Sequence, residues 1–452
     1  MYTEFAEPYR PQFHFTARKG WLNDPNGLVY YQGTYHLFFQ HNPSGNEWGN
    51  MTWGHAISTD LIHWEQTAHA LLPDSMGTMF SGSAVVDWHN TAGFQTGKSP
   101  ALVLIYTAAG GTSPESEGKP FTQCLAYSND GGKTFTKFTG NPVLPELAPE
   151  NRDPKVIWHE PSQKWIMALY LQGEEFALLS SPNLKEWTML QRLSLPGCME
   201  CPDFFELPLK GNPDISRWVF MAANGQYLLG EFDGHFFKAE TALISSDWGK
   251  NFYATQTFSD IPDGRRIQMA WMRGGEYPGM PFNQQMGFPC ELGLEETPEG
   301  IRVCRRPIQE IETLWDQSFE WNTVLLEQDE IVLPVSPSSL LDVEIQLESG
   351  NADMITMVVN KLPVTWNIRD NQLEVLDCSA SLPPHTNTLD LRLLIDRTSL
   401  EVFSLGGTHN FSCCTLEAIP EPFILLKKRG GTPLLSRMIF RTLQSIYNPK
   451  KE

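Results

Sequence analysis

The chain consists almost entirely of short apolar or alternating segments that are separated by turn-forming residues. Segments 35–39, 102–106 and 218–222 are examples, and Gly, Pro, Asn and Asp interrupt the sequence at short intervals. Apolar residues spaced as on one face of a helix are nearly absent, and 308–315 is the best short helix candidate. Runs this short and this often interrupted predict an all-β protein.

A weak internal repeat refines this prediction. Segment 58–64 reads STDLIHW, 181–187 reads SPNLKEW, and 128–135, SNDGGKTF, is a looser copy. Each copy follows a strand-like stretch and places a turn built by Asp or Asn before an aromatic residue. A unit recurring at roughly 50 to 70 residues predicts four-stranded propeller blades, about five of them in the first part of the chain. Ordinary hairpins in a large sandwich would also produce this pattern.

The pattern changes beyond residues 305–319. In 342–348 apolar residues alternate with polar ones, and Leu389, Leu391, Leu393 and Ile395 repeat the pattern, with Asp390 and Arg392 between them. Strands that are buried on one face only are typical of an antiparallel β-sandwich. We therefore expect a propeller over 1–308, a linker over 309–318 and a sandwich over 319–452.

Charge and composition exclude several classes of partner. The net charge of −20 would repel phosphate backbones and anionic lipids, so we expect neither nucleic acid nor a membrane as partner. The longest apolar runs, such as 101–106 and 165–171, are far shorter than a membrane helix of about 18 residues. The N-terminus shows no signal peptide, which predicts a cytoplasmic protein, or a secreted one if a leader has been removed. A neutral sugar is compatible with this surface.

Three acidic residues lie in unusual local settings. Asp24 lies in WLNDPNG, where Asp-Pro-Asn-Gly predicts a tight turn that would hold the carboxylate at the end of a strand. Asp153 follows Arg152, which in a pocket would keep that carboxylate ionised. Glu200 lies in the apolar, sulfur-rich CMECPD, where burial near other carboxylates would raise its pKa and suit a general acid.

The C-x-x-C around Glu200 has two other interpretations, a redox pair and half of a zinc site. We discount both, because the sequence lacks a βαβ context, a second C-x-x-C and a His pair at ligand spacing. The eight cysteines are too few for a disulfide scaffold in a chain of 452 residues.

These blocks, in this order, resemble glycoside hydrolase family 32, the invertase, levanase and exo-inulinase family. The likeness spans nearly the whole chain. Two departures are the Leu at position 22, where the family often has Met, and segment 404–407, where an Asn-Asp-Gly-like turn is usual. The matching segments are 10–15, 21–27, 39–43, 80–83, 152–156, 200–203, 247–254, 270–272 and 395–403.

The resemblance implies a five-bladed β-propeller followed by a β-sandwich, with the active site at the propeller axis. It assigns Asp24 as nucleophile, Glu200 as general acid/base and Asp153 as transition-state stabiliser, without a metal or other cofactor. For a retaining enzyme the carboxyl groups of Asp24 and Glu200 should lie about 5–5.5 Å apart. The expected substrate-binding residues are Trp21, Asn23, Gln40, Trp48, Phe80, Ser81, Arg152, Cys201, Tyr253 and Trp271. Trp53 competes with Trp48 for its place, and 273–287 should form part of the rim.

The function implied is an exo-acting, retaining β-fructosidase that hydrolyses terminal β-D-fructofuranosyl residues of sucrose, fructo-oligosaccharides, inulin or levan, as a monomer or homodimer. Fructosyl transfer is the nearest rival, and Asn23 favours hydrolysis because transferring members of the family often carry Ser there. Three further functions compete with these: the hydrolysis of sucrose 6-phosphate, the hydrolysis of arabinans or xylans, and sugar binding without catalysis.

Overall fold

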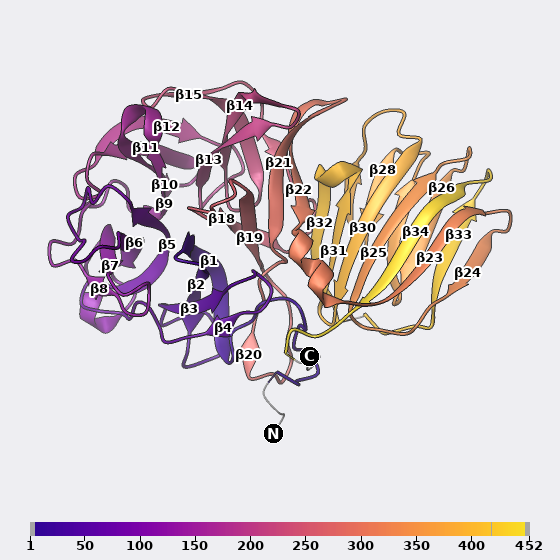
Figure 1. Ribbon diagram of the computed structural model, residues 1–452, viewed down its shortest axis with the longest axis horizontal. Helices are drawn as coiled ribbons and strands as arrows, with labels where there is room; N and C mark the ends of the chain where they lie inside the picture. The colour runs from indigo at the N-terminus through magenta and orange to yellow at the C-terminus, as the bar shows by residue number, and fades with distance from the viewer. Residues whose placement is uncertain (1–4, 417, 448–452) are drawn as a thin grey trace.

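The computed structural model describes residues 5–416 and 418–447, and it confirms the all-β prediction. The N-terminal part is a five-bladed propeller, drawn in indigo to salmon in Figure 1, and the C-terminal part is a two-sheet sandwich, drawn in orange to yellow. The outer limits expected for the two domains, residues 1 and 452, lie outside the described residues. Within the described ranges, no helix has both the length and the apolar character that a membrane crossing requires.

Each blade is an antiparallel sheet whose first strand lies nearest the propeller axis. Blades four and five are joined by one parallel bridge between Leu209 and Leu294. Blade one comprises β1 (Gly20–Tyr31), β2 (Thr34–Asn42), β3 (Thr52–Ser58) and β4 (Glu65–Gln66). Blade two comprises β5 (Thr78–Asp87), β6 (Ala101–Ala109), β7 (Phe121–Ser128) and β8 (Thr136–Lys137). Blade three comprises β9 (Arg152–His159), β10 (Lys164–Gln172), β11 (Glu175–Ser181) and β12 (Thr188–Ser194). Blade four comprises β13 (Asp203–Leu209), β14 (Asn212–Met221), β15 (Gln226–Phe232), β16 (Phe237–Ala239) and β17 (Ile244–Ser245). Blade five comprises β18 (Phe252–Thr257), β19 (Arg266–Met272), β21 (Cys290–Thr297) and β22 (Gly300–Pro307). The short strand β20 (Phe282–Asn283) pairs with β1 of blade one.

The sequence repeat marks equivalent turns in the first three blades. Its three copies begin at the last residues of β3, β7 and β11 and lead into the outermost strands. In the first copy the Asp60 carboxylate accepts from the backbone of Ile62 and His63, and the Trp64 indole donates to the carbonyl of Leu61 at 3.0 Å. The third copy repeats this closure with a 2.9 Å bond between Trp187 and Leu184. The prediction of blade repeats is therefore confirmed.

The inner strands hold the propeller together around its axis. Val85 of β5, Val156 of β9 and the β10 residues Met167 and Leu169 belong to one buried apolar cluster between adjacent blades. At the axis itself the chain buries an ion pair, since Lys155 Nζ lies 3.5 Å from Asp203 Oδ1 and both side chains are fully enclosed. The axis is thus filled by side chains between its two mouths.

The sandwich consists of two six-stranded antiparallel sheets. Its alternating segments behave as expected, because Val343, Ile345 and Leu347 face the core between the sheets. One sheet contains β23 (Trp315–Leu325), β34 (Leu434–Leu443), β25 (Leu341–Glu348), β30 (Thr388–Asp396), β31 (Ser399–Ser404) and β32 (His409–Cys414). The other contains β24 (Glu330–Pro334), β33 (Phe423–Arg429), β26 (Met354–Val359), β27 (Leu362–Asn367), β28 (Gln372–Val375) and β29 (Cys378–Ser381).

Short 3-10 turns account for the helical residues that the structure describes. The expected helix near 308–315 is the 3-10 helix η3 (Gln309–Leu314), and β23 begins directly after it, inside the segment expected to be a linker. The others are η1 (Pro114–Ser116), η2 (Glu160–Ser162) and η4 (Leu405–Gly407).

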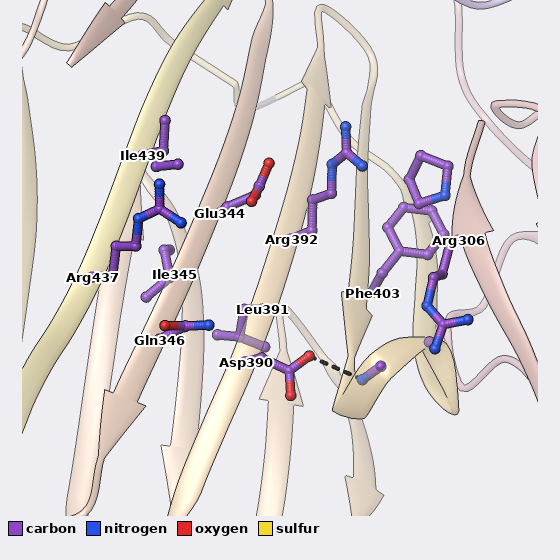
Figure 2. Close-up of a pocket in the computed structure, with 13 residues that line it drawn as sticks. Arg306, Glu344, Ile345, Gln346, Asp390, Leu391, Arg392, Phe403, Arg437 and Ile439 are labelled. Atoms are coloured by element: carbon purple, nitrogen blue, oxygen red, sulfur yellow. Dashed lines mark hydrogen bonds between the residues drawn. The ribbon is translucent and has the colours of Figure 1, made fainter. Parts of the chain in front are cut away.

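A groove of about 290 Å³ lies where β22 meets the outer face of the first sandwich sheet (Figure 2). Each of its three arginines forms an ion pair with a carboxylate: Arg306 with Glu295 at 2.8 Å, Arg392 with Asp342 at 2.8 Å, and Arg437 with Glu320 at 3.0 Å. Asp390, on β30, accepts from the backbone N–H of Gly406, as the dashed line in Figure 2 marks. The groove is therefore a charge-balanced seam between the two domains.

Candidate active site

The candidate site is a cavity of about 440 Å³ at one mouth of the propeller axis. It forms where the inner strands begin, because Asp24, Ser81, Asp153 and Tyr253 lie near the starts of β1, β5, β9 and β18, and Glu200 lies three residues before the start of β13. Five separate blades thus each contribute to one hollow. The lining residues are Trp21, Asn23, Asp24, Gln40, Trp48, Phe80, Ser81, Arg152, Asp153, Glu200, Tyr253, Trp271, Arg273 and Gly274.

Asp24 is held by a bulged strand, and the expectation that a tight turn holds it was wrong. Segment 24–27 lies inside β1, whose pairing with β2 shifts register between Leu22 and Pro25 and again after Asn26. The bulges absorb the turn-forming residues, since Gly27 has a φ of +53° and a Cβ there would lie 2.6 Å from the Phe38 ring. The strand β1 continues past the bulges because it pairs with β2 both before and after them.

Neighbouring donors orient the Asp24 carboxylate. Ser81 Oγ donates to Oδ2 at 2.5 Å, and Asn23 Nδ2 donates to Oδ1 at 3.0 Å. Asn23 is itself positioned by the indole N–H of Trp21, at 2.9 Å. Burial raises the pKa of Asp24, the charge of Glu200 adds to the rise, and the bonds from Ser81 and Asn23 oppose it.

Asp153 lines the base of the cavity, whereas Cys201, which the sequence predicted to bind substrate, is not among the lining residues and instead contacts Asp24 and Asp153. The backbone N–H of Cys201 donates to Asp153 Oδ2 at 3.1 Å, and the thiol lies 3.5 Å from carboxylate oxygens of both Asp153 and Asp24. Asp153, Glu200 and Cys201 all have a positive φ, 64°, 60° and 40°. Non-glycine residues held in this region are strained, and such strain concentrates at functional sites.

In the structure, the pKa shifts of Glu200 and Asp153 are the reverse of those expected from the sequence. Although burial opposes it, hydrogen bonds from Tyr253 and Arg152 lower the pKa of Glu200, so the raised pKa expected for this residue was wrong. Tyr253 Oη donates to Oε2 at 2.5 Å and Arg152 Nη2 donates to Oε1 at 2.8 Å. Burial instead raises the pKa of Asp153 to about 7, against the attraction of Arg152. Arg152 was expected to keep Asp153 ionised, but its guanidinium turns across the cavity to Glu200.

One cluster at the base has the composition of a metal site. Asp24, Asp153 and Cys201 each place one ligand atom within 4.8 Å of the others. Burial and the two carboxylate charges raise the pKa of the Cys201 thiol well above its usual value, and a thiol that keeps its proton is a poor metal ligand. The cluster is better explained by hydrogen bonding among its members, and a site without a metal remains our prediction.

The aromatic and amide residues occupy distinct parts of the cavity. Trp48 is 57% exposed at its rim, whereas Trp53 is fully buried behind it and donates to the carbonyl of Phe80, which decides between the two tryptophans. Gln40 is buried and its Nε2 has no partner among the described residues, so a donor remains free to meet a ligand.

Sequence reasoning missed two lining residues, Arg273 and Gly274, as individual members of the site. The guanidinium of Arg273 lies 4.6 Å from the Tyr253 ring centre and 6.0 Å from that of Trp271. Both residues begin the segment 273–287 that the sequence placed at the rim. The position of Arg273 directly after the Ala-Trp-Met motif at 270–272 is the sequence signal that could have identified it as a site residue.

Fold and site together define a propeller–sandwich protein with three carboxylates converging on an axial sugar-sized pocket. The family model described as "Glycosyl hydrolases family 32 N-terminal domain" matches residues 14–307. The chain belongs to glycosyl hydrolase family 32.

Named relatives and solved structures agree with this assignment. The chain is 39% identical to the levanase of Bacillus subtilis (strain 168), over 89% of this chain and 66% of the levanase. It is 36% identical to the extracellular exo-inulinase of Aspergillus niger (strain ATCC MYA-4892), over 67% of this chain and 65% of the inulinase. The chain thus spans just under two thirds of the length of these two relatives. The crystal structure of exo-inulinase from Aspergillus awamori superposes with a TM-score of 0.87 at 28% identity, covering 98% of this chain and 100% of that one.

Proposed function

We propose that this protein is a retaining, exo-acting β-fructosidase that hydrolyses terminal β-D-fructofuranosyl residues. The observation that carries the proposal is the convergence of Asp24, Asp153 and Glu200 on one cavity, each with hydrogen-bond partners that fix its orientation. Glycoside hydrolysis requires two such carboxyl groups on opposite sides of the scissile bond. The names of the relatives, levanase and exo-inulinase, support fructosides as the substrate class.

In the proposed reaction Asp24 attacks the anomeric carbon C2 while Glu200 gives its proton to the departing oxygen. A covalent fructosyl–Asp24 ester results, Glu200 then removes a proton from water, and that water releases fructose with retained configuration. The bonds from Ser81 and Asn23 aim the Asp24 carboxylate at one point in the cavity. Asp153, at the base, is placed to bind ring hydroxyls.

The first step needs a proton on Glu200, yet the free site holds that carboxyl as an anion. The pKa values of Asp24 and Asp153 are both raised, that of Asp153 to about 7, so Asp153 retains a proton part of the time near neutrality. We infer that the bound fructosyl unit redistributes the hydrogen bonds of Arg152 and Tyr253, which lower the pKa of Glu200 in the free site. The pH dependence of kcat/KM then reports several coupled carboxyl groups rather than one.

A blind cavity favours chain ends over chain interiors. At the base, Asp153 and the Cys201 that contacts it are both less than a tenth exposed, so a ligand enters only from the rim. A terminal fructosyl unit fits such a site, whereas an internal unit would need an open cleft on both sides. Sucrose, fructo-oligosaccharides, inulin and levan all present the terminal unit.

The test compares the wild type with Glu200→Gln and Asp24→Asn on sucrose, inulin and levan, with products separated by chromatography. We expect fructose as the dominant early product, and rates about 10²- to 10⁴-fold lower for Glu200→Gln, the range of general acid–base catalysis. Reaction in the presence of methanol gives the stereochemistry, because a retaining enzyme yields methyl β-fructofuranoside. The α-anomer, or internal cleavage products from inulin, would contradict the proposal.

A further inference from the structure

A second hollow, of about 380 Å³, lies at the opposite mouth of the propeller axis. It is formed by the far ends of the inner strands whose beginnings carry the catalytic groups. On β5, for example, Ser81 lines the first cavity and Val86 the second. Five residues of strand separate the two, which is about 16 Å. The buried pair of Lys155 and Asp203 lies on the axis, so the hollows are separate sites.

Aromatic rings form the wall of this hollow. Trp88 is 56% exposed at its edge, and its indole N–H donates to Asp260 Oδ1 at 2.8 Å. The Trp158 indole is tied in the same way to Glu160 Oε2, at 2.5 Å. Because their polar N–H groups are already satisfied, both rings are fixed and present apolar faces. Trp165 and Trp218 are buried in the same wall.

Polar groups line the rest of the hollow, and some hydrogen-bonding capacity remains open. The Arg266 guanidinium makes one hydrogen bond, to the carbonyl of Phe258 at 3.3 Å, and lies 5.3 Å from the Phe205 ring centre. Among the residues that the structure describes, no carboxylate forms an ion pair with it within 4.0 Å. Four of the five guanidinium donors are thus left for a ligand or water.

The balance of charges indicates what kind of ligand fits. The lining carboxylates of Glu160, Glu206 and Asp260 outnumber the one guanidinium, and burial lowers the pKa of His159, which favours its neutral form. An anion would be repelled by this set. A purely apolar ligand would leave the open donors of the Arg266 guanidinium unpaired, at a cost in desolvation. A neutral polyhydroxylated ring can stack on tryptophan and exchange hydrogen bonds with both kinds of charged group.

We propose that the far mouth of the propeller is a second, non-catalytic carbohydrate site, which binds β-fructan chains at Trp88. That the sugar is a fructan rests on the proposed function, whereas the site itself rests on its own lining residues. Since the two sites open on opposite ends of the propeller, a short substrate cannot occupy both. The second site therefore anchors long chains and leaves the hydrolysis of sucrose unchanged.

The direct test is affinity electrophoresis in native gels that contain inulin, levan or dextran. The proteins are Glu200→Gln, which leaves the polymer intact, and the double variant Glu200→Gln/Trp88→Ala. We expect fructan to retard Glu200→Gln and the added Trp88→Ala to remove at least half of that retardation. Val332→Ala, at a position of equal exposure (57%) on the sandwich, is the matched control and should change nothing.

Kinetics provide the second measurement. Trp88→Ala alone should raise KM for inulin or levan at least threefold while kcat/KM for sucrose stays that of the wild type. Trp48→Ala removes an equally exposed tryptophan (57%) from the catalytic mouth and should impair both substrates. Retardation that is the same with and without Trp88, or that only dextran causes, would overturn the second site. Trp88-dependent retardation by fructan in a protein that hydrolyses no fructoside would overturn the proposed function and leave the site standing.

Discussion

At the scale of single residues, Arg152 decides how the three carboxyl groups differ. Its guanidinium forms a close ion pair with Glu200, at 2.8 Å, whereas it is 4.0 Å from the carboxylate of Asp153, its neighbour in sequence. The cation therefore lowers the pKa of Glu200, and burial dominates at Asp153. Local sequence identified all three residues. It could not predict their protonation, because that depends on which way one side chain turns and on Tyr253, a residue from another blade.

The hydroxyl of Tyr253 gives a prediction at this scale. Tyr253→Phe removes the 2.5 Å hydrogen bond to Glu200 Oε2 and keeps the ring. That bond lowers the pKa of Glu200, so without it the pKa rises and the alkaline limb of kcat/KM moves to higher pH. We also expect kcat to fall by about 10- to 100-fold, since a hydrogen bond to a charged group contributes roughly 1.5–3 kcal/mol. The measurement is the pH profile for sucrose.

Tyr170→Phe serves as the control for this profile. The Tyr170 ring lies under the Arg152 guanidinium, at 4.6 Å, as the Tyr253 ring lies under that of Arg273, but the Tyr170 hydroxyl donates to Glu150 at 3.3 Å and not to Glu200. Its pH profile should match that of the wild type. An alkaline limb that moves equally in both variants, or downward in Tyr253→Phe, would count against Glu200 as the general acid.

At the scale of elements, the strands and their repeats follow from the sequence more directly than the site does. The Asp-or-Asn turns at 58–64 and 181–187 predict blade positions because their hydrogen bonds are local. Segment 24–27 carries an equally strong turn signal and is nevertheless part of β1. Pairing with β2 and packing against Phe38 override that signal, and neither partner is visible in a local pattern. A local sequence pattern does not reveal the buried contacts between the inner strands either.

Those inner strands yield a prediction about stability. Asp203 of β13 accepts from the backbone N–H of Thr257 at 2.6 Å and faces Lys155, whose Nζ donates to the Thr257 carbonyl at 2.5 Å. Asp203→Asn keeps a hydrogen-bond acceptor but leaves a buried ammonium without its counter-charge. Removing one member of a buried pair costs about 3–5 kcal/mol. We expect the urea midpoint of the propeller transition to fall accordingly.

The double variant Lys155→Met/Asp203→Asn separates charge from packing. With no uncompensated ion left, it should recover most of the stability that Asp203→Asn loses. Lower stability in the double variant than in Asp203→Asn would show that the ion pair is not the cause.

At the scale of the whole molecule, the chain ends tie the two domains together. Ser445 Oγ donates to the side chain of Gln12 at 2.8 Å, and the backbone N–H of Ile446 donates to the Gln12 carbonyl at 2.9 Å. Asp247, before β18, pairs with Arg305 at 2.5 Å and accepts from Ser412 of β32. The segment that carries Tyr253 is thus anchored on the sandwich, so the second domain supports the geometry of the site in the first.

The central contact of this interface is a buried histidine. His14 Nδ1 lies 2.8 Å from Asp396 and Nε2 lies 2.8 Å from Glu401, both in the sandwich. Burial by itself would lower the pKa of His14, but these two carboxylates raise it from 6.5 to about 9. The imidazolium is therefore the form that the folded protein prefers at neutral pH, and it links the N-terminal segment to the hairpin of β30 and β31, far away in the sequence.

This linkage predicts how stability depends on pH. The contribution of His14 is fully present below pH 6.5, the pKa of the unfolded chain, and is lost as the pH rises to about 9, because only the folded state keeps the proton in that window. The total is about 3 kcal/mol, at roughly 1.4 kcal/mol per unit of pKa shift. We expect the stability of the wild type relative to His14→Gln to fall by this order between pH 6.5 and 9, as measured by urea unfolding at several pH values. Referencing to His14→Gln cancels the other groups that titrate in the window, so parallel profiles for the two proteins would show that His14 is neutral in the folded state.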